Sequence, residues 1–323
     1  MKTIFFGTQP YDRESFDRIN ADYGIRIKYH RSHLNIDNVP LAQGADAVCI
    51  FVNDSADAPT VGELARMGVR LIALRCAGFN NVDLKAAAEH GITVVRVPAY
   101  SPYAVAEHAV ALMLSLNRKV HRAYWRTRDG NFALHGKTAG IVGTGKIARA
   151  LIRILRGFGM EVLGYDPCPD EAFARESGMT YVPLTELYRR SDIISLHCPL
   201  TDRTLHMIDA EAIGQMKDGV IIINTGRGQL IRTSDLIEGL KEKKIGAAGL
   251  DVYEEEADYF YQDTSDRIMD DDMLARLLSF NNVILTSHQG FFTREALDNI
   301  ARTTLENIQA FSHGECLNEV KYK

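Results

Sequence analysis

The sequence lacks the features that mark secreted, membrane-spanning or zinc-binding proteins. Its apolar runs, such as residues 220–223, are far shorter than the roughly 18 residues that a membrane span needs. The first apolar stretch breaks off at Gly7, so we expect no signal peptide. The five cysteines are odd in number and form no Cys-x-x-Cys pair, which argues against a disulfide framework or a metal site and favours a reducing cytoplasm: Cys49, Cys76, Cys168, Cys198 and Cys316.

An excess of basic charge is also missing. The 323 residues include 37 Lys and Arg against 42 Asp and Glu, which gives a net charge of −5. We therefore expect no broad surface for nucleic acid or an anionic membrane, although this balance does not exclude a local basic patch. There is no defensible repeat, low-complexity segment or long block of charge, and the length predicts roughly two domains.

What the sequence contains is a regular alternation of short apolar runs and amphipathic stretches. It predicts an α/β protein with two doubly wound parallel-sheet domains, Rossmann-like or flavodoxin-like, with a cleft between them. Strands are expected at residues 3–6, 25–29, 47–52, 70–74 and 93–96, and then at 139–142, 161–165, 193–196, 220–223, 246–250 and 283–285. Helices are expected at 14–22, 61–67, 84–89, 147–158, 294–311 and 103–118, the last with an Ala-rich face that fits a core or a dimer contact equally.

The most informative motif is Gly143-Thr144-Gly145-Lys146-Ile147-Ala148, which follows a predicted strand and opens a helix. It matches G-x-G-x-x-G/A, in which Gly143 allows the tight turn and Gly145 lets the backbone approach a pyrophosphate. Asp166 follows 21 residues after Gly145, at the end of the next strand, where an acid binds the adenosine ribose and repels a 2′-phosphate. The motif therefore predicts a dinucleotide site that prefers NAD to NADP.

Three later strands end in polar residues, at the edge where open α/β sheets bind ligands. These ends bring Arg227, Glu256 and His288 to one rim. Each has an alternative interpretation when taken alone: a surface ion pair for Arg227, a solvated acid for Glu256 and a satisfied loop histidine for His288. Beside a nucleotide motif, the three together indicate a catalytic site.

These segments, taken together, resemble the D-isomer-specific 2-hydroxyacid dehydrogenase family, and within it the D-lactate dehydrogenase branch. The resemblance covers nearly the whole chain and rests on residues 74–81, 97–102, 143–148, 197–201, 224–228, 249–256 and 288. The longer interval between Glu256 and His288, with its aromatic and acidic loop at 259–263, is similar to the lactate branch more than to the phosphoglycerate or formate branches.

The resemblance implies a role for each residue. Arg227 would hold the substrate carboxylate, His288 would donate a proton during reduction, and Glu256 would orient the imidazole and stabilise its charged form. Residues at the substrate would be Ala77, Gly78, Phe79, Tyr100 and Phe291. Residues at NAD would be Gly143, Gly145, Lys146, Ile147, Asp166, Cys198, Pro199, Thr204, Thr225, Gly226 and Asp251.

Some alternatives stay open. His197 also lies near a strand end and competes with His288 as the acid, whereas His108 fits a helix-packing or interface role better. Gly78, Tyr100 and Phe291 could serve the fold alone. Cys198 is interpreted as a packing residue beside the cofactor, because no base pattern supports a nucleophile.

The resemblance implies an NAD-dependent enzyme that reduces pyruvate to D-lactate in the cytoplasm, as a homodimer or homotetramer. The alternatives are an enzyme for bulkier 2-oxo acids and a dinucleotide-sensing, corepressor-like binding protein; the latter usually has tails beyond the closing helix, which we do not expect here. The substrate-binding domain would comprise residues 1–99 and 290–323, and the NAD-binding domain residues 100–289.

Three positions depart from the family pattern. Arg232 stands where relatives usually carry Asp, which would alter a helix cap or an ion pair. Ala148 replaces the commoner third glycine, a change that the motif tolerates. The connection before Gly136 is shorter than in lactate-branch relatives, near the family's subunit contact, and so bears on the oligomeric state.

Overall fold

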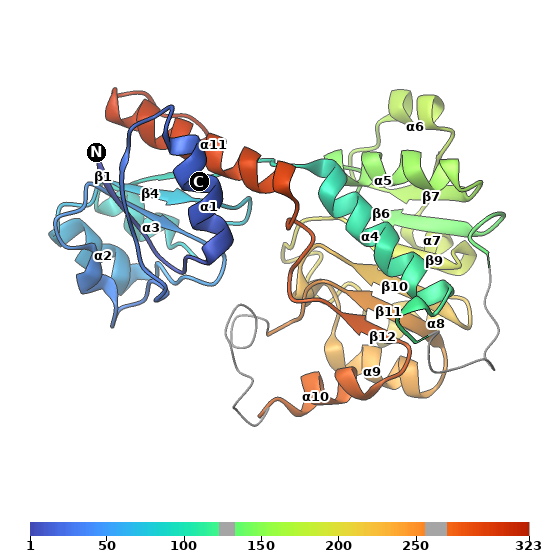
Figure 1. The fold of residues 1–323 in the computed structure, drawn as a ribbon. Helices are drawn as coiled ribbons and strands as arrows, with labels where there is room; N and C mark the ends of the chain where they lie inside the picture. The colour runs from blue at the N-terminus through green and yellow to red at the C-terminus, as the bar shows by residue number, and fades with distance from the viewer. Residues whose placement is uncertain (123–132, 256–269, 323) are drawn as a thin grey trace. The chain divides into compact units, whose positions relative to one another are not determined.

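The chain folds into two units. It forms most of unit 1, then all of unit 2, and returns to unit 1 with its last segment. The computed structural model describes residues 1–122, 133–255 and 270–322 (Figure 1). Unit 1 comprises Met1–Ser101 and Phe292–Lys323, and unit 2 comprises Pro102–Phe291. Each crossing lies two residues after the position expected from the sequence.

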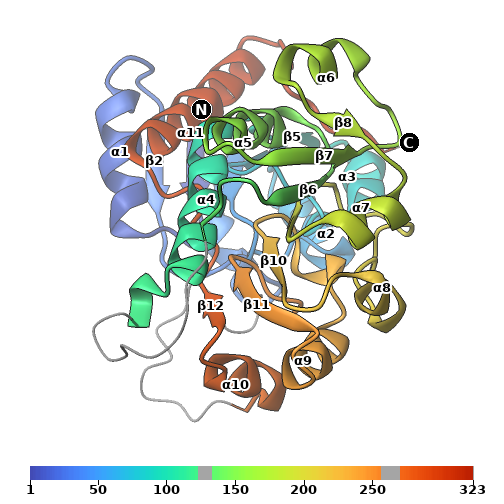
Figure 2. The ribbon, with the colours of Figure 1, turned by 90° about the vertical axis from the view of Figure 1, so that its right-hand side faces the viewer.

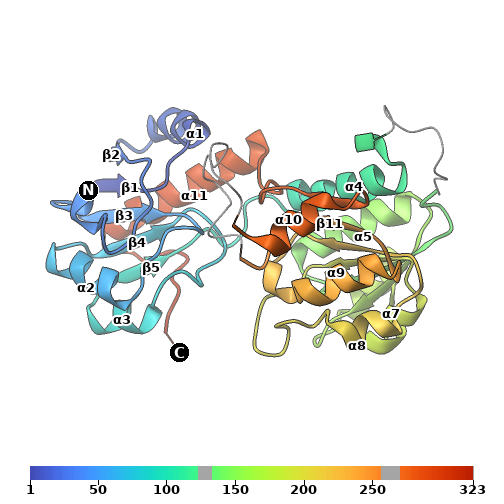
Figure 3. The ribbon, with the colours of Figure 1, turned by 90° about the horizontal axis from the view of Figure 1, so that it is seen from below.

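Unit 1 is a five-stranded parallel sheet in the order β2-β1-β3-β4-β5, the order of flavodoxin-like folds. Helices α1 and α11 pack together on one face of the sheet, and α2 and α3 lie on the other (Figure 3). The elements are β1 (Lys2–Phe5), α1 (Pro10–Asn20), β2 (Arg26–Tyr29), the short 3₁₀ helix η1 (Val39–Ala42), β3 (Ala47–Ile50), α2 (Ala58–Arg66), β4 (Leu71–Leu74), α3 (Leu84–Glu89), β5 (Thr93–Val95) and α11 (Arg294–Ser312).

Unit 2 contains a seven-stranded parallel sheet in the order β12-β11-β10-β9-β6-β7-β8, which extends the Rossmann order by one strand (Figure 2). The elements are α4 (Pro102–Asn117), η2 (Val120–Arg122), β6 (Thr138–Val142), α5 (Lys146–Gly157), β7 (Glu161–Tyr165), α6 (Glu171–Ser177), β8 (Thr180–Tyr181), α7 (Leu184–Arg190), β9 (Ile193–Leu196), α8 (Ala210–Gln215), β10 (Val220–Asn224), η3 (Gly228–Leu230), α9 (Thr233–Lys241), β11 (Ile245–Leu250), α10 (Asp272–Ser279) and β12 (Val283–Leu285). The predicted α/β class with two doubly wound parallel sheets is confirmed.

The apolar face of α4 belongs to the core of unit 2. Ala106, Ala109 and Met113 are fully buried, and the helix lies against α5, β10 and β11. Of the two interpretations of the Ala-rich face, core packing therefore accounts for these side chains. The same helix brings His108 next to the end of β11, which matters for the site below.

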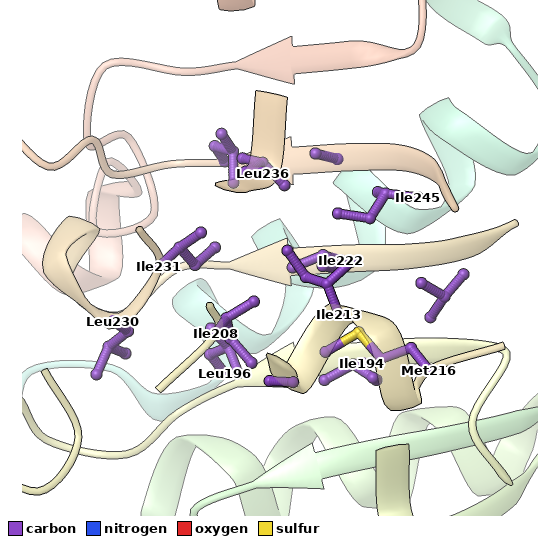
Figure 4. Packing of buried hydrophobic residues seen from close by; sticks show 14 of the residues in the cluster. Ile194, Leu196, Ile208, Ile213, Met216, Ile222, Leu230, Ile231, Leu236 and Ile245 are labelled. Carbon is purple, nitrogen blue, oxygen red and sulfur yellow. The ribbon is translucent and has the colours of Figure 1, made fainter. Parts of the chain in front are cut away.

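A second apolar cluster covers the opposite face of the sheet. It joins strands β9, β10 and β11 to helices α8 and α9, and Figure 4 shows Ile194, Ile222 and Ile245 among its members. Each such side chain contributes roughly 1.5–3 kcal/mol when it is removed from water. With both faces covered, only the edges of the sheet are left to carry polar chemistry. Within the described residues, no helix is both long and apolar enough to span a membrane.

Candidate active site

The turn between β6 and α5 requires glycine at Gly143. Its φ is +86°, and a Cβ there would lie 2.6 Å from the backbone nitrogen of Cys198. Gly145 caps α5 and a Cβ on it would meet nothing within 4 Å, so its backbone faces open space. Ala148 is fully buried, which explains why a small residue is needed there. Lys146 and Ile147 form the first turn of α5, whose N–H groups suit an anionic group.

Asp166 at the end of β7 holds this turn. Its Oδ2 accepts hydrogen bonds from the Thr144 nitrogen at 2.8 Å and the Thr144 hydroxyl at 3.0 Å, and its Oδ1 accepts from the Cys168 nitrogen at 2.9 Å. Partial burial opposes ionisation, but these hydrogen bonds outweigh it and hold the pKa of Asp166 below its usual value. The carboxylate is therefore ionised near neutral pH beside the glycine turn.

The end of β9 carries His197 and Cys198. The His197 ring lies 2.8 Å from the Ser195 hydroxyl, and burial lowers the pKa of His197 to about 4. Such an imidazole is neutral near pH 7 and does not suit a proton donor. Burial also raises the pKa of Cys198 to about 11, and its sulfur contacts that of Met207 at 3.5 Å, as expected of a packing residue.

The loops after β9 and β10 are held in shape by hydrogen bonds between their own polar side chains and their backbone. Thr204 donates its hydroxyl to Pro199 O at 2.7 Å. The buried Asn224 donates to Arg227 O at 2.8 Å and accepts from the Gly226 nitrogen at 3.0 Å, which shapes the loop that presents Arg227.

Beyond Arg227, the chain from β10 runs against the segment that follows β11. A Cβ on Gly228 would lie 2.0 Å from the carbonyl of Tyr253, so only glycine fits. In the same loop, the buried Thr225 hydroxyl has no partner among the described residues.

Asp251, at the end of β11, organises the turn that carries His288. Its Oδ1 accepts from the Thr286 hydroxyl at 2.6 Å and from the Gln289 nitrogen at 2.7 Å, and its Oδ2 accepts from the Gly290 nitrogen at 2.8 Å. The His288 nitrogen donates to Asp251 O at 2.8 Å. The φ of His288 is +53°, a left-handed conformation that costs about 1–2 kcal/mol for a residue with a side chain. The surrounding hydrogen bonds are what fix it.

Two residues before Glu256, the chain is held by Glu254. Its carboxylate accepts from the His206 ring and, at 3.0 Å, from the Thr233 nitrogen at the start of α9. Partial burial acts against ionisation, but the contacts with Thr233 and His206 lower the pKa of Glu254 overall. Glu256 itself lies outside the described residues.

In unit 1 the loop after β4 offers consecutive backbone donors. Among the described residues, the N–H groups of Ala77, Gly78 and Phe79 have no protein acceptor. Arg96 fixes the loop, because it donates to Ala77 O at 2.8 Å and stacks 5.1 Å from the centre of the Phe79 ring. Successive free N–H groups at a strand end suit a carboxylate.

Two of the predicted substrate residues stand next to the crossings between the units. Tyr100 is half-buried, and its carbonyl accepts from Asn299 of α11 at 2.8 Å. Phe291, the last residue of unit 2, is buried.

Comparison with known proteins decides the family. Residues 110–290 match the profile of the D-isomer specific 2-hydroxyacid dehydrogenase, NAD binding domain. D-lactate dehydrogenase of Escherichia coli is 50% identical over 329 residues, which cover 99% of this chain and 100% of that protein. The chain belongs to the D-isomer-specific 2-hydroxyacid dehydrogenase family.

Solved structures of the same family agree along the whole chain. The apo-structure of D-lactate dehydrogenase from Escherichia coli has a TM-score of 0.88 at 48% identity and covers 99% of this chain and 100% of its own. D-lactate dehydrogenase with NAD⁺ from Lactobacillus jensenii has a TM-score of 0.84 at 31% identity, with 100% of both chains covered. This dehydrogenase family is an NAD-dependent one, so the predicted enzyme class and cofactor are confirmed.

The residues of unit 2 fit the cofactor of a 2-hydroxyacid dehydrogenase. Gly145 leaves open space at the first turn of α5, Asp166 provides an ionised acid at the end of the next strand, and the Thr225 hydroxyl is buried without a partner in the described chain. A pyrophosphate, a ribose and a further polar group would satisfy these three features in turn. Among the described residues, no cluster of three or more His, Cys, Asp or Glu side chains could hold a metal ion.

The sequence interpretation missed several residues that build the site. Asn224 and Thr286 shape the loops of Arg227 and His288, and both could have been found as polar residues at the end of an apolar strand. His108 was given a helix-packing or interface role and His206 was not singled out, because each contacts a loop far away in the sequence.

Proposed function

We propose that this chain reduces pyruvate to D-lactate with NADH, and that Arg227, Glu256 and His288 are its catalytic residues. The observation that carries the proposal is the order of three neighbouring strands in one sheet. Arg227 follows β10, Asp251 follows β11, and His288 follows β12, and β11 pairs in parallel with both of the other strands. The carboxyl ends of parallel strands share one edge, so an arginine, an acid-held turn and a histidine meet there.

The chemistry assigns each side chain a task. The guanidinium of Arg227 would bind the carboxylate of a 2-oxo acid through two parallel hydrogen bonds, and it would polarise the neighbouring carbonyl. The bound NADH supplies the hydride. His288 would give a proton to the carbonyl oxygen and, in the reverse direction, take it back. His197 is a poor rival, because burial holds its pKa at about 4.

The substrate would also be held by unit 1. The free N–H groups of Ala77, Gly78 and Phe79 support a second contact to the carboxylate, and Tyr100 and Phe291 are the proposed walls for the substrate methyl group. The cofactor would be held by Gly143, Gly145, Lys146, Ile147, Asp166, Cys198, Pro199, Thr204, Thr225, Gly226 and Asp251. We propose pyruvate rather than a bulkier 2-oxo acid as the substrate, because the similar protein from Escherichia coli described above is a D-lactate dehydrogenase.

A substrate panel tests the proposal. The purified protein is given NADH or NADPH with pyruvate, phenylpyruvate or a branched-chain 2-oxo acid, and cofactor oxidation and product stereochemistry are followed. We expect D-lactate from pyruvate and NADH. L-lactate as the product, or no turnover with any acid, would refute the assignment, and a higher kcat/KM for the bulkier acids would replace pyruvate as the substrate.

We further propose a cytoplasmic homodimer or homotetramer. The support for the location is that all five cysteines are free thiols, and the support for the assembly is membership of the family. Sedimentation velocity across a hundredfold range of concentration tests the assembly, and a single monomer-sized species throughout would refute it.

A further inference from the structure

Asp251 is a buried carboxylate that depends on an unusual number of donors. Its side chain is 2% exposed, so water contributes little to it. Three donors come from the segment that carries His288: the Thr286 hydroxyl and the nitrogens of Gln289 and Gly290. A fourth comes from a different part of unit 2, because Nε2 of His108, on helix α4, lies 3.1 Å from Asp251 Oδ1. A buried carboxylate that loses a donor is destabilised, so every member of this set matters.

The hydrogen bonds determine which atom of His108 carries a proton. The Thr286 hydroxyl has a single hydrogen, and at 2.6 Å it is given to Asp251. Thr286 Oγ1 is also 3.1 Å from Nε2 of His108, and it can only accept there. Nε2 must therefore bear hydrogen and point between the two oxygens, in the neutral ring as in the charged one.

We propose that His108 is a positioning residue for the reaction: its Nε2–H completes the donors around Asp251 and thereby fixes the turn that presents His288. This inference rests on the proposed function of His288. The His288 backbone is left-handed, a conformation that persists only where neighbouring groups determine it. Asp251 fixes this conformation from one side, because its carbonyl and carboxylate oxygens accept hydrogen bonds from the nitrogens of His288, Gln289 and Gly290. His108 holds Asp251 in place from helix α4.

The packing around Gly290 supports the same conclusion. A Cβ built on Gly290 would lie 3.0 Å from Asp251 Oδ2, 3.7 Å from Val105 and 3.8 Å from the His108 ring. The turn is therefore seated directly on α4, next to both ends of the His108–Asp251 contact. A shift of His108 or Asp251 would therefore displace the backbone next to His288.

Two substitutions of His108 separate its hydrogen bond from its bulk. His108→Leu removes the donor, whereas His108→Gln keeps an N–H group at a similar distance from the backbone. Glu107→Gln is the matched control, because Glu107 is the exposed neighbour on the same helix. Thr286→Val removes the other side-chain donor with little change of shape and serves if the leucine variant does not fold.

We expect His108→Leu to lower kcat for pyruvate reduction by about 10–100-fold, the scale for a misplaced catalytic group, with a much smaller change in KM. His108→Gln should recover kcat to within a few-fold, and Glu107→Gln should match the unchanged chain. Hydrogen–deuterium exchange of the peptide spanning 286–291 should quicken in the leucine and valine variants and stay slow in the glutamine variant.

Each outcome decides the matter. Unchanged kcat and exchange in the leucine and valine variants would overturn the inference, and so would a glutamine variant as poor as leucine. If the unchanged chain reduces no 2-oxo acid, the proposed function fails instead. The exchange data alone then decide whether His108 holds the turn.

Discussion

Arg227 stands on a loop that its neighbours have already shaped. The amide of the buried Asn224 binds both Arg227 O and the Gly226 nitrogen, so the backbone of the arginine is fixed. Its Nη1 donates to Gly226 O at 2.8 Å, which orients one side of the guanidinium. A substrate carboxylate would therefore meet a cation whose conformational freedom is already restricted, and less entropy would be lost on binding.

Removal of the Arg227 charge should weaken catalysis more than folding. For Arg227→Gln we expect a loss of transition-state stabilisation of about 1.5–3 kcal/mol or more, the scale of a hydrogen bond to a charged group. Arg227→Lys keeps the charge but not the planar fork, so it should recover only part of the loss. Steady-state kcat/KM with pyruvate measures both variants. An unchanged value for the glutamine variant would exclude the proposed role.

The proton donor is tested at the same scale. His288→Ala should abolish most of the reduction of pyruvate, because no other histidine described near the strand ends suits the task. His197→Gln should retain most of it, because the His197 imidazole, with a pKa of about 4, is neutral at working pH. Initial rates at pH 7 compare the two variants, and the reverse order of activities would move the proton donor to His197.

At the scale of elements, helix α9 begins in an unusual way. Its N-cap residue, Arg232, offers no side-chain acceptor, and the first helical nitrogen, that of Thr233, is satisfied by Glu254 instead. Arg232 also makes a 3.4 Å ion pair with Asp235, but a half-exposed pair of this kind contributes little. The start of α9 is thus satisfied by a residue from the loop that precedes Glu256.

A better cap at this position should stabilise the protein. We expect Arg232→Asn to be more stable than Arg232→Ala by about 0.5–2 kcal/mol, because only the asparagine supplies an acceptor to the first turn and both remove the same ion pair. Asparagine is used rather than aspartate so that no further negative charge is added beside Asp235 and Glu254. Urea unfolding at pH 7.5 measures the difference, and equal stabilities would mean that Glu254 already satisfies the helix start.

How well each element could be predicted depended on its length and apolar character. Strands β9 and β12 were expected at their observed residues, since each consists mainly of apolar, β-branched or leucine residues. Helix α1 begins four residues earlier than expected, because Pro10 opens it and Asp12 caps the Gln9 nitrogen at 2.9 Å. Helix α3 was expected at its observed residues 84–89, whereas α6 and α8, of similar length, were not predicted, because six or seven residues hold little periodicity to identify a helix.

At the scale of the whole molecule, local sequence patterns predict the contacts between distant segments less well than they predict single strands and helices. The carboxyl-end rule predicted Arg227, Glu256 and His288 at one edge of a sheet; Arg227 and His288 follow β10 and β12 of the same sheet, and Glu256 lies outside the described residues. It could not pair His108 with Asp251 or His206 with Glu254, because these contacts join residues 143 and 48 positions apart. Such pairs arise only from the packing of α4 and the loop after β9 onto the folded sheet. They are tertiary contacts that no local window contains.

The burial of His197 should also make the free energy of unfolding depend on pH. The pKa of its imidazole is lowered by burial from 6.5 to about 4, so between these pH values the unfolded chain binds a proton that the folded chain does not. The stabilisation is therefore complete above pH 6.5 and is lost as the pH falls toward 4, by roughly 3 kcal/mol. Asp166, Asp192 and Asp251, whose pKa values are lowered, lose their contribution only below about pH 4.

This difference in pH range makes the contribution of His197 measurable. Urea unfolding at intervals from pH 7.5 to 4.5 should show stability falling with pH in the unchanged chain and a flatter dependence in His197→Gln, which cannot take up the proton. The glutamine variant need not be as stable at pH 7.5, since the Ser195 contact changes, so the slope is the quantity to compare. Equal slopes would mean that the folded and unfolded chains bind the His197 proton equally, so that burial does not lower its pKa, and His197 would again be a rival proton donor to His288.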